Sequence, residues 1–243
     1  MLVSDELVPE PEVGRVFARE VTPGLADAAP SGRIRLDALA RWIQDVAHAD
    51  VTDAGLADRA VWVVRRLRVW VERFPRFGDA ASVRTFCSGS GRMWAERRTS
   101  IATPGGGRVE TAALWVHLDP VSLRPSPLDE DELALYAPST LGRQVKARLH
   151  HPAPPETPGA RRPWQFRATD LDLAGHVNNA AYWAPFEEEL LGGDAAEPAA
   201  LDGELEFRTP AQPGRFDVLV DGARRWIVAE SGEVHASLAL AAP

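Results

Sequence analysis

Apolar and polar positions follow two periods along the first half of the chain. Between residues 36 and 54 an apolar side chain recurs every three or four positions, which predicts an amphipathic helix of about five turns. Residues 61–73 alternate instead, with Leu67, Val69 and Val71 on one face of an extended strand and charged side chains mostly on the other. Further strands are predicted at residues 81–88, 94–103 and 109–117.

The same order of elements recurs after residues 151–159, which contain four prolines and a glycine. A strand is predicted at residues 164–168, then a loop, then a helix over about 179–191. Pro185 lies inside this helix, so we expect it to kink the helix or delay its start. The segment 205–208 and a turn at 210–214 follow, and later strands are predicted at residues 216–221, 225–229 and 233–241. The turn segments 74–83 and 209–218 are similar, and so are the hairpins 101–115 and 227–240, which indicates an internal duplication.

These elements predict an α+β fold of two tandem units, each a helix packed on a curved antiparallel sheet. Two such units would pair sheet to sheet or edge to edge and so protect their edge strands. A dinucleotide-binding fold is disfavoured, because strands and helices do not alternate and no GxGxxG sequence occurs. The predicted organisation is a loose tail at residues 1–13, a first domain at 14–138, a proline-rich linker at 139–162 and a second domain at 163–243.

Composition narrows the class of protein. The 243 residues carry 27 basic and 35 acidic side chains, a formal charge of −8, which argues against a nucleic-acid binder. No run approaches the ~18 apolar residues of a membrane span, and the acidic start does not resemble an export signal. The one cysteine, Cys87, excludes an intramolecular disulfide and is interpreted as a small buried side chain. We therefore expect a cytoplasmic protein.

The densest polar stretch is residues 170–182, with the sequence DLDLAGHVNNAAY, just before the second predicted helix. Asp170 and Asp172 alternate along a segment expected to be extended, so only one of them is expected to face a given pocket. Gly175 permits a tight turn, and Asn178 or the asparagine after it can cap the helix. The free N–H groups at a helix start suit an anion or a developing oxyanion.

This combination predicts acyl hydrolysis. The carboxylate of Asp170 or Asp172 would activate water or attack directly, while N–H groups hold the carbonyl oxygen and the imidazole of His176 lies nearby. The alternative from the residues alone is purely structural: the Asp and Asn side chains cap a helix and His176 fills a turn.

Residues 170–182 resemble the signature of hotdog-fold thioesterases. Three first-half segments extend the likeness to the acyl-ACP thioesterases of plants and bacteria: WVVRRL at residues 62–67, RFPRFGD at 73–79 and SGSGR at 88–92. The resemblance covers about residues 14–240. It implies two tandem hotdog domains, with the acyl pocket largely in the first and the catalytic motif in the second.

The resemblance also implies an activity, the hydrolysis of fatty acyl-ACP, or of acyl-CoA, to a free fatty acid and the carrier thiol. No metal or organic cofactor is implied. Asp172 and His176 match the family's catalytic aspartate and histidine. The substrate-positioning and oxyanion residues would then be Gly175, Val177, Asn178 and Asn179. Glu188, which otherwise belongs to a solvated face with its neighbours, could support the site.

Three polar positions of the plant members fall on Ala174, Pro210 and Ala211 here. Single-domain bacterial hotdog thioesterases often carry a similar Asp-x-Ala-Gly turn, and there the aspartate and helix N–H groups suffice. The alternative is a catalytically reduced protein that only binds acyl thioesters. A hotdog hydratase is disfavoured, because Asp172 and His176 do not follow that family's spacing.

The distribution of basic side chains indicates which binding partners to expect. Arg65, Arg66 and Arg68 form part of a local basic excess that could dock an acidic acyl carrier protein or the phosphates of coenzyme A. The alternative is that these arginines pair with acids elsewhere on the solvent face of the sheet. A homodimer is left open by the sequence.

Overall fold

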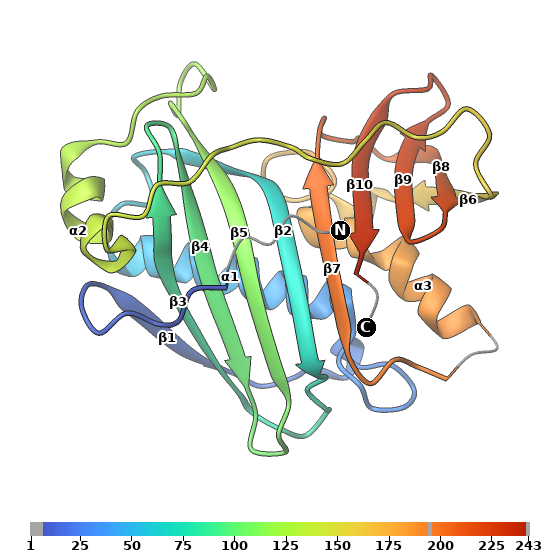
Figure 1. Cartoon of the computed structure of the whole chain (residues 1–243), viewed down its shortest axis with the longest axis horizontal. Coiled ribbons are helices and arrows are strands. Elements are labelled where there is room, and N and C mark those ends of the chain that lie inside the picture. Colours follow the sequence, from blue (N-terminus) through green and yellow to red (C-terminus); the bar gives the residue numbers. More distant parts are fainter. Residues whose placement is uncertain (1–6, 194–195, 242–243) are drawn as a thin grey trace.

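The protein, described here from a computed structural model, is defined over residues 7–193 and 196–241, and its strands form a single antiparallel sheet (Figure 1). The strands are β1 (Val16–Val21), β2 (Val61–Arg73), β3 (Ala81–Ser90), β4 (Trp94–Ala102), β5 (Arg108–Leu118), β6 (Ala160–Phe166), β7 (Leu201–Phe207), β8 (Gly214–Asp221), β9 (Arg224–Ala229) and β10 (Val234–Leu240). Their order across the sheet is β1-β3-β4-β5-β2-β7-β10-β9-β8-β6. The first five belong to the first half of the chain and the last five to the second.

The helices are few, and α1 and α3 lie on the same side of the sheet (Figure 1). They are η1 (Leu25–Asp27), α1 (Leu36–Asp53), α2 (Glu130–Thr140), η2 (Ala168–Asp170), η3 (Asn179–Trp183) and α3 (Ala184–Gly192). The predicted stripe of α1 is buried, with Leu39 and Ile43 packed in the same core as Val69 and Val83. Burial of each such side chain contributes ~1.5–3 kcal/mol.

The two halves repeat one order of elements on either side of the sheet's centre. Strands β1, β2, β3, β4 and β5 correspond to β6, β7, β8, β9 and β10, and each set is mirrored about the β2–β7 pair. The two units therefore join edge to edge, one of the two arrangements expected from the sequence. Leu67 pairs with Leu205 on the helix side, while Arg66 pairs with Glu206 on the opposite side.

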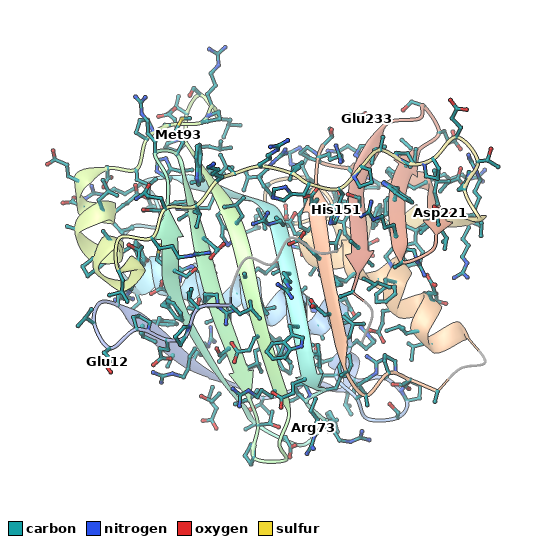
Figure 2. The ribbon with its side chains drawn as sticks, in the orientation of Figure 1. Glu12, Arg73, Met93, His151, Asp221 and Glu233 are labelled. Atoms are coloured by element: carbon teal, nitrogen blue, oxygen red, sulfur yellow. The ribbon has the colours of Figure 1, made fainter. Side chains whose placement is uncertain are left out.

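The linker crosses the side of the sheet that faces away from α1 and α3 (Figure 1). After α2, an extended segment at residues 141–159 leads to β6. Indole N–H groups fix it at two points, because Trp94 donates to the carbonyl of Val145 and Trp226 donates to that of Pro152. Figure 2 shows His151 on this segment, over β7 and β10.

The predicted helix and strands of the first half are confirmed with shifts of a few residues at their ends. In the second half, the expected helix at 179–191 is instead a 3₁₀ turn, η3, that runs into α3. Pro185 lies in the first turn of α3, where its missing N–H is harmless, so the α-helix starts late. Strand β1 and helix α2 were not predicted.

The described part of the expected loose tail is bound to the sheet. Residues 1–6 lie outside the described residues. Beyond them, Glu10 forms an ion pair with Arg84 of β3, and the carbonyl of Val8 accepts a bond from the Arg98 guanidinium of β4. The expectation of a loose tail is therefore corrected for residues 7–13.

Candidate active site

The polar stretch before η3 folds into a small hairpin. The N–H of Gly175 donates to the carbonyl of Asp172 (3.0 Å), and the N–H of Asp172 donates to the carbonyl of His176 (3.0 Å). Gly175 has φ +74°, a left-handed conformation that side chains rarely adopt, so glycine is required to close this turn. The hairpin ends on Asn178, whose N–H donates to the carbonyl of Asp170 (2.8 Å).

The carboxylate of Asp172 is fixed within this hairpin and lines a large cavity. One oxygen accepts the N–H of Ala174 (2.9 Å), and the other lies 3.5 Å from the amide nitrogen of Asn178. The same asparagine caps η3, because its side-chain oxygen accepts the N–H of Ala180 (2.9 Å). Asn178 therefore orients the carboxylate and starts the helix at once, which confirms the predicted asparagine cap.

The cavity has a volume of about 1270 Å³ and is bounded by α1, α2, the strands of the first half and the Asp172 turn. Its wall is largely apolar and aromatic, formed in part by Ala47, Val51, Trp62, Trp115, Tyr136 and Trp164. Leu171, Leu173 and Leu191 also line it and are exposed, which places them at the opening. Sequence reasoning did not select Trp115, Trp164 or the leucines, because apolar side chains are equally suited to a core.

Only some of the predicted oxyanion donors are available. The N–H groups of Gly175, Val177 and Asn178 donate to carbonyls within the protein. Among the described residues, those of His176 and Asn179 have no hydrogen-bond acceptor. Asn179 lines the cavity, so its N–H is the donor best placed to meet a carbonyl oxygen beside Asp172.

The turn places His176 and Asp170 differently from expectation. His176 is exposed and does not line the cavity, so the structure does not bring its side chain together with Asp172. Asp170 does line the cavity, as Asp172 does, because the segment before it is the 3₁₀ turn η2 rather than an extended strand. Its carboxylate accepts the N–H of Arg167 (2.7 Å).

The three glutamates of α3 do not form the single solvated face that was expected. Glu187 is buried and pairs with Arg33 of the first half. Glu189 pairs with Arg225 of β9. Glu188 is exposed and lines the cavity, and its supporting role at the site stays a prediction.

The three arginines expected to dock a carrier instead connect the two halves. Arg68 forms a two-pronged pair with Asp202, with distances of 2.9 and 2.7 Å. Arg66 is buried, with its guanidinium 3.5 Å from Glu204, and Arg65 donates to a backbone carbonyl of the second half. The docking expectation is corrected, because β2 pairs with β7 and brings these side chains onto acids and carbonyls across the joint.

One cluster of the described residues has metal-ligand chemistry. His151, Glu204 and Glu206 are buried, and their ligand atoms lie within 4.8 Å of one another. Glu206 accepts the N–H of His151 (3.0 Å), and the guanidinium of Arg66 lies beside Glu204. Because arginine and backbone donors already balance these carboxylates, the cluster is better interpreted as an ion network that ties the linker to the sheet.

A second turn in the first half repeats the Asp172 hairpin bond by bond. The N–H of Gly32 donates to Ala29 (2.8 Å), that of Ala29 to Arg33 (2.8 Å), and that of Arg35 to Asp27 (2.9 Å). These bonds match those of Gly175, Asp172 and Asn178. Each position corresponds to the one 143 residues later in the chain, and Gly32 has φ +84°.

The side chains of this first-half turn differ at the positions that matter for hydrolysis. Ala29 stands where the second half has Asp172, and Arg33 stands where it has His176. The N–H of Leu36, which corresponds to that of Asn179, donates to the carboxylate of Glu187 (2.9 Å). The first-half turn therefore lacks the carboxylate at position 29, and a protein side chain already covers its N–H.

Comparison with known proteins agrees with this architecture. Residues 14–136 match the acyl-ACP thioesterase N-terminal domain, and residues 155–215 match the acyl-ACP thioesterase C-terminal domain. The chain belongs to the acyl-ACP thioesterase family. The resemblance recognised in the sequence is thereby confirmed.

The relatives of this thioesterase-family chain are distant. An uncharacterized protein of Mycobacterium tuberculosis H37Rv is 29% identical over 209 residues, which cover 86% of this chain and 83% of that protein. A chloroplastic palmitoyl-acyl carrier protein thioesterase of Gossypium hirsutum is 28% identical over 172 residues, which cover 65% of this chain and 40% of that protein.

Two solved structures share the fold. A 12:0-ACP thioesterase from Umbellularia californica superposes with a TM-score of 0.72 at 20% identity, over 93% of this chain and 96% of that one. An acyl-ACP thioesterase from Bacteroides thetaiotaomicron gives 0.74 at 16% identity, over the same shares. The common architecture is a large antiparallel sheet with few helices. No helix in the described part of this chain is long and apolar enough to cross a membrane.

One of the three positions that the resemblance matched to polar residues of plant members, Ala211, supports the turn through backbone contacts. Ala211 is fully buried, its N–H donates to the Tyr182 hydroxyl (2.9 Å), and its carbonyl accepts the N–H of Val177 (3.0 Å). Burial raises the pKa of Tyr182 to about 12, and the Asp172 carboxylate acts in the same direction. The neutral phenol thus stays available as a support for the segment after β7.

Proposed function

We propose that the protein hydrolyses fatty acyl thioesters carried by acyl carrier protein, or by coenzyme A, to a free fatty acid and the carrier thiol. The observation that carries this proposal is the meeting of two groups in one cavity. The carboxylate of Asp172 and the N–H of Asn179, which has no acceptor among the described residues, both line a largely apolar space of about 1270 Å³. An apolar cavity with a few polar groups is typical of a site for an acyl chain and its reactive end.

In the proposed reaction, Asp172 takes a proton from water as the water oxygen bonds to the thioester carbon. The carbonyl electron pair moves onto oxygen, which accepts the N–H of Asn179. Collapse of this intermediate breaks the carbon–sulfur bond, and the proton passes from Asp172 to the leaving sulfur. Asn178 holds the carboxylate in place through its amide. A substrate-positioning role for His176 stays a prediction and requires its exposed side chain to turn toward the substrate.

The domain assignment is part of the proposal. The first half, residues 14–138, would be a hotdog unit that supplies most of the acyl pocket, and residues 163–243 would be the catalytic hotdog unit. The repeated order of strands and the matching turns support this division. A cytoplasmic setting and a homodimer stay predictions from the sequence.

A second candidate is a protein that binds acyl thioesters without hydrolysis. The alanine at 174 and the proline at 210, where plant-type members have polar residues, favour it. The hydrolase is preferred, because Asp172 is held by two hydrogen-bonding groups and faces the cavity rather than being buried in an ion pair.

The test is a panel of acyl-ACP and acyl-CoA chains in which thiol release is followed directly. We expect release with at least one chain and its near-complete loss in Asp172→Asn. Asp58→Asn, the same change at an exposed position outside the cavity, should retain activity. Tight acyl binding without release of thiol from any chain would support the binding protein instead.

A further inference from the structure

The second half of the molecule contains a side chain that reaches across to the helix start of the first half. Glu187, on α3, places a carboxylate oxygen 2.9 Å from the N–H of Leu36, where α1 begins. Both residues are buried, and α1 packs directly against η3 and α3. The contact thus crosses the boundary between the two halves, from the middle of one helix to the first residue of the other.

The internal repeat places a residue equivalent to Glu187 on α1. This residue would reach from the first half toward the helix start of the second half. Positions of the first-half turn and of the first turns of α1 correspond to those 143 residues later, so Leu36 corresponds to Asn179 and Gln44 corresponds to Glu187. Buried positions support the register through the helices: Leu39 and Ile43 correspond to Tyr182 and Phe186.

Gln44 has the position and the freedom that this register requires. It is half-buried on α1 and lines the same cavity as Asp172 and Asn179. Within the described residues its amide makes no hydrogen bond to the protein, unlike the carboxylate of Glu187, which also binds Arg33. Glutamine and glutamate side chains have the same length, so the reach seen for Glu187 is available to Gln44.

We infer that Gln44 is a further catalytic residue, whose amide N–H donates to the thioester carbonyl oxygen together with the N–H of Asn179. This inference rests on the proposed hydrolysis and adds a residue from the first half to a site otherwise built by the second. Water attacks the carbonyl carbon as Asp172 takes its proton, and the carbonyl electron pair moves to an oxygen held by two donors. When the carbon–sulfur bond breaks, that pair reforms the carbonyl and the sulfur receives the proton.

The identity of residue 44 determines the charge placed beside the thioester carbonyl oxygen. A carboxylate there would accept the N–H of Asn179, as Glu187 accepts that of Leu36, and would repel the negative charge that develops on the carbonyl oxygen. A neutral amide offers a donor and leaves the Asn179 N–H to the substrate. The first-half turn thus shows the arrangement expected with a carboxylate at residue 44, in which a protein side chain occupies the N–H at the helix start.

The experiment compares Gln44→Ala, Gln44→Glu and the wild type on the best thioester of the panel. Loss of one oxyanion donor is expected to lower kcat on the order of 10²-fold with KM little changed, and Gln44→Glu should be lower still. Gln44→Glu should regain activity as the pH falls, because a protonated carboxyl group can donate. The control is Gln165→Glu on β6, the same change outside the cavity, which should behave as the wild type.

A binding measurement separates this inference from the proposed hydrolysis. Two non-hydrolysable coenzyme A analogues are titrated by calorimetry: a ketone, which keeps the carbonyl, and a thioether, which lacks it. Gln44→Glu should weaken the ketone on the order of tenfold or more and leave the thioether unchanged. This result would uphold the role of Gln44 even if no thioester were hydrolysed. Equal effects on both analogues, or wild-type kcat in both Gln44 variants, would overturn it.

Discussion

Two turns in this molecule, residues 27–35 and 170–178, share a backbone hydrogen-bond pattern and differ in the side chains that it presents. Both have a left-handed glycine, and both lead into the helix of their own half. One presents the carboxylate of Asp172 to a cavity, and the other has Ala29 at that position. The comparison teaches that the fold sets the direction of each side chain, while a few residue identities decide whether the position has any chemistry.

The first-half turn has a structural role instead of a catalytic side chain. Arg33 is buried and binds Glu187 and Glu197, both from the second half. These contacts hold the start of α1 against α3. The Asp172 site of the second half therefore lies against α1, and α1 is held in place through the first-half turn.

The largest expected effect tests whether the two turns are chemically equivalent. Asp172→Asn should lower kcat by ~10³-fold or more, because the amide cannot take the proton from water. Adding Ala29→Asp should not restore activity, since Glu187 still covers the Leu36 N–H in that half. Thiol release under single-turnover conditions measures both variants. Recovery in the double variant would mean that the first-half turn is a competent second site.

The next effect concerns the ion network of the first-half turn. Glu187→Gln leaves the buried guanidinium of Arg33 with a weaker partner, and breaking such a pair costs roughly 3–5 kcal/mol of unfolding free energy. Glu188→Gln, one residue along α3 and exposed, should change stability by less than ~0.5 kcal/mol. Urea unfolding followed by circular dichroism measures both. Similar midpoints for the two variants would show that Arg33 does not depend on Glu187.

Sequence reasoning was most successful where structure is set locally. The strand at 61–73 and the helix at 36–54 follow from periodicity, which burial on one side imposes on consecutive residues. It also found the Asp172 turn, because Gly175 and Asn178 have local roles in closing a turn and capping a helix. Helix α2 was missed although Asp129 and Glu132 form a capping box that the sequence displays.

What could not be predicted depends on contacts between distant segments. For Arg66 and Arg68 the sequence left open a docking surface or pairing with acids elsewhere, and only the pairing of β2 with β7 reveals that acids of the second half meet them. Gln44 carries no local signal at all. It becomes a candidate only when the two turns are placed in register, and the shared Asp and Gly of residues 27–34 and 170–177 could have given that register from the sequence.

A smaller effect separates backbone strain from catalysis. Gly175→Ala and Gly32→Ala each force an alanine into a left-handed conformation, at a cost of ~1–2 kcal/mol of stability. No atom lies within 4 Å of a Cβ built on Gly175, so the cost is conformational rather than steric. Only Gly175→Ala should also lower kcat, by about tenfold, because it shifts Asp172. Parallel unfolding and kinetic measurements check this; an equal loss of kcat in Gly32→Ala would show that the two turns move together.

The smallest effect is an acid sensitivity that arises from Asp37 in the first half. Asp37, in the first turn of α1, is largely buried and corresponds to Ala180 in the second half. Burial works against its charged form, but hydrogen bonds from Arg35 and Arg41 outweigh it and hold the pKa of Asp37 below its ordinary value of 3.8. Its ionised form therefore contributes stability above that value, and this contribution is lost as the pH falls through the lowered pKa.

Asp37→Asn should accordingly lower the unfolding free energy by about 1 kcal/mol near neutral pH. The difference from the wild type should shrink as the pH is taken below 3.8, since both side chains are then increasingly uncharged. Urea unfolding at a series of pH values measures the difference. Ala180→Asp, the reverse exchange in the second half, should not create a comparable acid dependence, because Asn178 there replaces the arginine at position 35. A pH-independent gap between Asp37→Asn and the wild type would mean that the pair stabilises α1 by packing rather than by charge.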